Sequence, residues 1–87
     1  MRIETEAFLM GSSDIHSAKS NKDFVKINFI IEGEFCGFFT RKSEGDRIKT
    51  AKPFAELAKT RAPVRCVAVL DLKFTQKGTF VDLLAVN

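Results

Sequence analysis

The sequence predicts a mainly β protein of five strands, with one short helix between the third and fourth strands. Three observations predict this class: apolar and polar residues alternate along most of the chain, turn residues separate the alternating stretches, and a helical spacing occurs once. Because 87 residues can build only one small core, a single domain over residues 1–87 is expected.

Three stretches in the first half of the chain have the period of a strand. They cover residues 2–10, 24–32 and 35–40, and the last two are joined by a tight turn at Gly33. On the first stretch, Phe8 breaks an otherwise charged face. The segment between the first two, GSSDIHSAKSNKD, is rich in small and polar residues and predicts a loop or an irregular two-stranded flap.

The helix is expected over residues 52–59. Residues 41–50, RKSEGDRIKT, are charged and turn-like, and Thr50 is expected to cap the helix. Pro53 is tolerated in the first turn, where the backbone N–H groups lack partners. The spacing i, i+3, i+4 gives one apolar stripe, made of Phe54, Leu57 and Ala58.

The last two strands are expected over residues 64–74 and 80–86, joined by the turn TQKGT. Both alternate, and simple alternation places Phe80, Asp82, Leu84 and Val86 on one face of the closing strand, opposite Val81, Leu83 and Ala85.

Five strands with a helix between the third and fourth are the order of an OB-fold-like barrel. Two alternatives stay open: a small SH3-like barrel, and an α+β sheet with the helix laid on one face.

Several classes of site find little support in the sequence. His16 is the only histidine, and no cluster of acids and cysteines accompanies it, so neither a metal nor a cofactor is expected. Asp71 and Asp82 are expected to face each other across the last hairpin, paired with cations or water rather than acting as a catalytic pair. We therefore do not expect an enzyme.

The two cysteines, Cys36 and Cys66, are interpreted as reduced, buried thiols because they lie in apolar stretches without CxxC spacing. With no leader and no apolar run long enough to span a membrane, the expected compartment is the cytoplasm.

Basic and aromatic residues are interleaved in the middle of the chain. Residues 41–65 carry eight Lys or Arg against three acids, and residues 24–39 hold five of the nine phenylalanines. A basic groove that follows phosphates, with rings that stack on bases, holds single strands without reading their sequence. We therefore expect a module that binds single-stranded nucleic acid, DNA or alternatively RNA. The competing hypothesis is a small β-barrel module that binds another protein.

The residues expected to contact the strand come from the flap, the central hairpin and the closing hairpin. Phe29 is assigned to the core with Phe54, whereas a bulge at Gly37 could expose any of the three phenylalanines beside it, Phe35, Phe38 and Phe39. Phosphates are expected on Lys19, Lys22, Lys26, Arg41 and Lys42, and bases on Phe24 with Phe38 or Phe80.

The length of the chain and two of its segments are similar to those of a known family. The segments are HSAKSNKDF after the opening strand and KFTQKGTFVDLLAV at the closing hairpin. On these the chain resembles the filamentous-phage single-stranded DNA-binding proteins of the gene V type, although that family relies on tyrosines and this chain has none.

The resemblance implies a five-stranded OB-type barrel. It also implies a cytoplasmic homodimer that coats single strands cooperatively in the DNA replication of a phage or plasmid. The flap contacts of the family would fall on Lys19, Lys22 and Phe24, and its closing hairpin would supply dimer contacts and an aromatic at Phe74 or Phe80.

Overall fold

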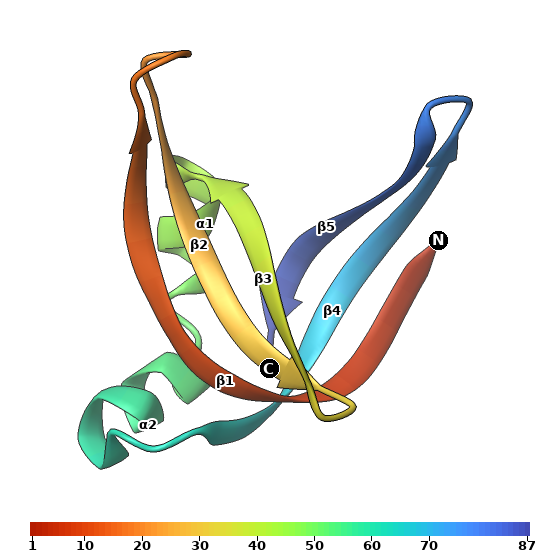
Figure 1. The fold of residues 1–87 in the computed structure, drawn as a ribbon. Helices are drawn as coiled ribbons and strands as arrows, with labels where there is room; N and C mark the ends of the chain where they lie inside the picture. Colours follow the sequence, from red (N-terminus) through yellow and green to blue (C-terminus); the bar gives the residue numbers. More distant parts are fainter.

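Five antiparallel strands form one sheet in the order β3-β2-β1-β4-β5 in the computed structural model, which describes all 87 residues (Figure 1). The mainly β class predicted from the sequence is confirmed. The strands are β1 (Arg2–Ser17), β2 (Lys22–Ile31), β3 (Glu34–Arg41), β4 (Val64–Thr75) and β5 (Gly78–Val86), and two helices, α1 (Lys42–Ile48) and α2 (Lys52–Thr60), connect β3 to β4.

The long strand β1 belongs to both halves of the sheet. Residues 2–9 pair with β4, and residues 8–17 pair with β2. The register shifts between Leu9 and Gly11, and such a bulge bends a strand. The sheet therefore has two arms that diverge as a V in Figure 1: the first arm holds the second half of β1 with β2 and β3, and the second arm holds the first half of β1 with β4 and β5.

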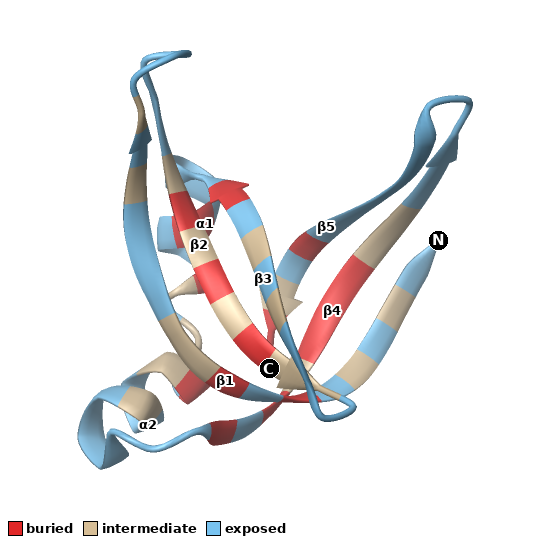
Figure 2. Ribbon diagram, viewed as in Figure 1, coloured by how far each residue is buried: buried red, intermediate tan, exposed pale blue.

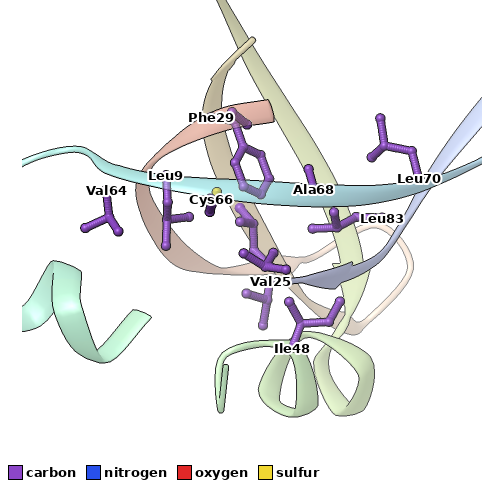
Figure 3. Packing of buried hydrophobic residues seen from close by; sticks show 12 residues of the cluster. Leu9, Val25, Phe29, Ile48, Val64, Cys66, Ala68, Leu70 and Leu83 are labelled. Carbon is purple, nitrogen blue, oxygen red and sulfur yellow. The ribbon is translucent and has the colours of Figure 1, made fainter. Parts of the chain in front are cut away.

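The core lies between the two arms where they meet. Figure 3 shows Ile48 of α1, Val25 of β2 and Leu83 of β5 in one cluster. Buried residues concentrate in the lower part of the V, whereas the free ends of both arms are exposed (Figure 2). The buried cluster comprises Ala7, Leu9, Val25, Ile27, Phe29, Ile48, Val64, Cys66, Ala68, Leu70, Leu83 and Val86.

The flap between the first two strands is a β-ribbon. β1 continues to Ser17, β2 begins at Lys22, and only residues 18–21 form the turn. The hairpin from β2 to β3 is closed by Glu32 and Gly33, which have φ values of 52° and 78°. Two residues with positive φ are typical of a tight hairpin turn that fixes the register of its strands.

The five predicted strands are present, but the sheet that they form is not closed into the predicted barrel. β3 and β5 are the two edges and form no ladder with each other. Helix α1 lies beside both edges, and the Nη2 atom of Arg47 donates a hydrogen bond of 3.1 Å to the carbonyl of Leu84 in β5. Helix α1 is therefore hydrogen-bonded to this part of β5, while β3 lies near β5 without pairing with it.

The prediction of one helix was wrong, because residues 42–48 form α1 rather than a turn. Gly45 belongs to the segment expected to be turn-like, but it is buried in the middle of the helix. A Cβ atom at this position would lie 2.5 Å from both Thr40 Oγ1 and Val25 Cβ. The glycine thus allows the helix backbone to pack directly on β2 and β3.

We expect Gly45→Ala to destabilise the protein by about 1–3 kcal/mol, because the added methyl group overlaps Val25 and Thr40 in a packed site. Urea unfolding measures this change. Gly11→Ala is the control, since a Cβ at Gly11 meets no atom within 4 Å. Equal midpoints for the two variants would contradict the close packing of α1.

Two local details also differ from the sequence predictions. Thr50 does not cap α2: Ala51 holds the N-cap position, and the Thr50 hydroxyl donates to the carbonyl of Arg47 instead. In β5 the register shifts opposite Val69 and Leu70, so Leu84 is an extra residue. Val86 consequently turns inward and is buried with Leu83, which simple alternation had placed on the other face.

The two cysteines are free, but only one is buried. Burial raises the pKa of the Cys66 thiol, which belongs to the core cluster. Cys36 is half-buried, so its expected burial was wrong.

Candidate nucleic-acid interface

The face of the first arm that points away from the core, here called the outer face, combines aromatic and basic side chains. Successive side chains of a strand alternate between faces, so those beside the buried Val25, Ile27 and Phe29 point outward. The outer face comprises Phe24, Lys26, Asn28 and Ile30 of β2 with Phe35, Gly37, Phe39 and Arg41 of β3.

Basic and aromatic side chains face each other across the β2–β3 hairpin. Lys26 pairs with Phe39 and Phe24 pairs with Arg41 in the register. The ammonium of Lys26 lies 5.4 Å from the centroid of the Phe39 ring, which is the geometry of a cation–π contact. The outer face thus offers a flat ring and an adjacent positive charge at the same position.

The structure decides which phenylalanines near Gly37 are exposed. Phe35 is 66% exposed and Phe39 is 62% exposed, whereas Phe38 points to the core side and meets Phe29 edge-on, with ring centroids 5.8 Å apart. The assignment of Phe38 to base contacts therefore needs correction, because its ring is packed and lies on the wrong face. Phe24 is on the outer face and half-buried.

Ion pairs separate the predicted phosphate contacts into two groups. Lys42 is bound to Asp46 at 3.2 Å and to Asp14 at 3.5 Å, and the hydrogen bond to Asp46 raises the pKa of its ammonium. Its charge is therefore compensated within the chain. The other four, Lys19, Lys22, Lys26 and Arg41, form none of the ion pairs in the structure.

The four uncompensated cations lie toward one end of the first arm. Lys19 is in the exposed turn of the flap and Lys22 begins β2, while Lys26 and Arg41 lie on the outer face itself. At the opposite end, Phe35 lies next to two acidic residues of the β2–β3 turn, Glu32 and Glu34. Phosphates are therefore favoured at the Phe39 end and disfavoured at the Phe35 end.

Phe80 is exposed but does not join the outer face of the first arm. It lies in β5 of the second arm, opposite Lys73, whose ammonium is paired with Asp82 at 3.1 Å. That carboxylate raises the pKa of Lys73. Asp71 does face Asp82 in the register, as expected, and its carboxylate is bound by the amino group of Met1 at 3.2 Å.

Phe39 was not among the base contacts expected from the sequence, although the turn sequence indicates its position. The two-residue turn at Glu32 and Gly33 pairs Ile31 with Glu34, which places Phe39 opposite Lys26 without any bulge. Phe39 also borders an open groove between the edges of β3 and β5. Its lining is Phe39, Thr40, Arg41, Glu44, Lys73, Asp82, Leu83 and Leu84.

His16 has a local partner in the flap. Its Nδ1 atom lies 2.7 Å from the carboxylate of Asp23, the residue opposite it in the ribbon. This contact ties the two strands of the flap together near its turn.

Comparisons of the chain with protein-family models, with curated proteins and with solved structures gave no match. Neither helix has the length and apolar character needed to cross a membrane.

Proposed function

We propose that the outer face of the first arm binds single-stranded nucleic acid, DNA with RNA as the alternative, largely independently of sequence and without catalysis. The observation that carries the proposal is the exposed ring of Phe39 beside the uncompensated charges of Lys26 and Arg41. Bases would stack on Phe39 and Phe24, and phosphates would contact the cations around them.

The location of this face supports the proposal. OB-folds bind oligonucleotides on the face of their second and third strands and on the loops that join strands 1–2 and 4–5. We interpret the sheet as a barrel of this type held open between β3 and β5. The corresponding loops here carry Lys19 in the flap turn and Lys77 in the β4–β5 turn, and both are exposed.

The salt dependence of binding tests the proposal. Each phosphate contact on a single strand contributes about −0.7 to the slope of log K against log salt concentration, so four cations predict a slope of about −3. Fluorescence anisotropy with oligo(dT) and with a duplex of equal length measures slope and preference. We expect tighter binding to oligo(dT), whereas absent binding, or equal binding to both, would rule the proposal out.

A second copy of the chain is the proposed protein partner. The second arm ends in a free edge, β5, which exposes Phe80, Val81 and Leu84, and its partner strand exposes Phe74. An edge strand with exposed apolar side chains favours pairing with another chain. We propose a homodimer through this hairpin, leaving the outer face of each first arm free for nucleic acid.

Sedimentation equilibrium tests the homodimer. We expect the wild type to be dimeric at micromolar concentration and Val81→Asp to be largely monomeric, because the new carboxylate would be desolvated in the interface. Ser20→Asp, at an exposed position of the flap turn and outside this hairpin, is a control for added charge. A monomeric wild type at the highest attainable concentration would contradict the dimer.

The exposed hairpin is also compatible with the competing hypothesis, namely that the domain is a module that binds a different protein. Binding that is indifferent to salt and to oligo(dT) would favour that hypothesis. Two free cysteines fit a reducing compartment, and we place the proposed activity in the cytoplasm.

A further inference from the structure

Besides its uncompensated cations, the outer face carries one buried polar atom that has no hydrogen-bond partner. The amide oxygen of Asn28, Oδ1, is shielded from solvent and accepts no hydrogen bond. Asn28 pairs with Gly37 across the β2–β3 hairpin, between the rings of Phe35 and Phe39 on β3. Because a buried acceptor without a donor is unfavourable, its presence on this face calls for a functional explanation.

Gly37 leaves room for two side chains of β2. A Cβ atom at Gly37 would lie 2.6 Å from Cε of Lys26 and 3.0 Å from Oδ1 of Asn28. The end of Lys26 therefore crosses β3 over the bare glycine backbone and brings its ammonium above Phe39. In the free protein, Lys26 occupies both the ring face and the space beside the Asn28 oxygen.

We propose that Asn28 recognises the base that stacks on Phe39, by accepting a hydrogen bond from an N–H group on the edge of that base. Stacking requires the Lys26 ammonium to leave the ring, and an adjacent phosphate offers it a stronger partner. The same movement opens the space beside Asn28 Oδ1. Diagonal neighbours across an antiparallel pair are about 7–8 Å apart, a span that one base can bridge.

This inference rests on the proposed function and adds a requirement for the ligand. Every standard base carries an N–H donor on its Watson–Crick edge, so the contact favours unpaired bases over duplex without choosing among them. Thymine has a single such donor, N3–H. Oligo(dT) methylated at N3 keeps the stacking surface and the phosphates but has lost the donor.

The test compares oligo(dT) with N3-methylated oligo(dT) for the wild type and Asn28→Leu. We expect the wild type to bind the unmethylated strand about five- to tenfold more tightly, the range of one hydrogen bond. Asn28→Leu should bind both strands alike and melt at an equal or higher temperature, since an unsatisfied polar group is removed. Asn87→Leu makes the same chemical change at the exposed end of the chain and should keep the preference.

Gly37→Ala provides a second variant that leaves Asn28 in place. Its methyl group would lie against the amide oxygen, so it should also abolish the preference for the unmethylated strand. Equal binding of both strands by the wild type, or an unchanged preference in both variants, would overturn the role of Asn28 while leaving stacking intact. Failure of the wild type to bind either strand would instead overturn the proposed function.

Discussion

Replacing Phe39 by Ala will weaken binding to oligo(dT) about 5- to 150-fold, which corresponds to the roughly 1–3 kcal/mol of one base stack. The ring is 62% exposed, lies under the ammonium of Lys26 and does not belong to the core cluster. Its loss should therefore leave the melting temperature nearly unchanged. Fluorescence anisotropy and thermal unfolding of the same samples measure the two effects.

Phe74→Ala is the matched control for this experiment. Phe74 is 69% exposed, but it lies on the second arm, away from the outer face. Its loss should not change the affinity for oligo(dT) at concentrations where the oligomeric state is constant. Equal losses of affinity in the two variants would mean that any exposed ring binds nucleic acid nonspecifically. An unchanged affinity of Phe39→Ala would contradict the proposal that a base stacks on Phe39.

Replacing Phe29 by Ala will destabilise the protein by about 3–5 kcal/mol, the range found when a buried ring is deleted from a core. Phe29 is fully buried, packs edge-on against Phe38 and lies in the cluster where the two arms meet. Since small domains are stable by only about 5–15 kcal/mol, this loss is a large share of the total free energy of unfolding. Urea unfolding monitored by circular dichroism measures the change.

Phe35→Ala is the control for the stability experiment. Phe35 is 66% exposed on the neighbouring strand, and its removal should change the free energy of unfolding by less than about 0.5 kcal/mol. A loss of stability as large as that of Phe29→Ala would show that the outer face is covered in solution, which would also bring the proposed binding surface into question.

The strands could be predicted from sequence because each buries one face. Ala7 and Leu9 in β1, and Val25 with Ile27 in β2, follow the two-residue period and are buried as expected. The bulges at Leu9 and in β5 escaped prediction, since an extra residue changes the face without changing composition.

Helix α1 could not be recognised from propensity, because its stability depends on tertiary packing. Only Gly45 and Ile48 of its seven residues are buried, and two positions are too few to show the helical period in the sequence. A glycine in that setting resembles a turn until the strands beneath it are known.

The kinds of side chain in the candidate site could be predicted from the sequence, but not all of the residues that form it. Lys26, Arg41 and Phe24 do share one face, as the alternation of β2 and β3 implies. Sequence could not show that Lys42 is neutralised by Asp14 and Asp46, because Asp14 comes from the distant flap. Nor could it show that Asn28 lacks a partner, which depends on the bare backbone at Gly37.

Chemical-shift mapping of ¹⁵N-labelled protein during titration with oligo(dT) locates the binding surface and so tests whether single strands bind at the outer face. We expect the largest shifts on β2 and β3, at Lys26, Asn28, Phe39 and Arg41, with further shifts in the flap turn around Lys19. Shifts confined to the β4–β5 hairpin or to α2, with β2 and β3 unchanged, would contradict it.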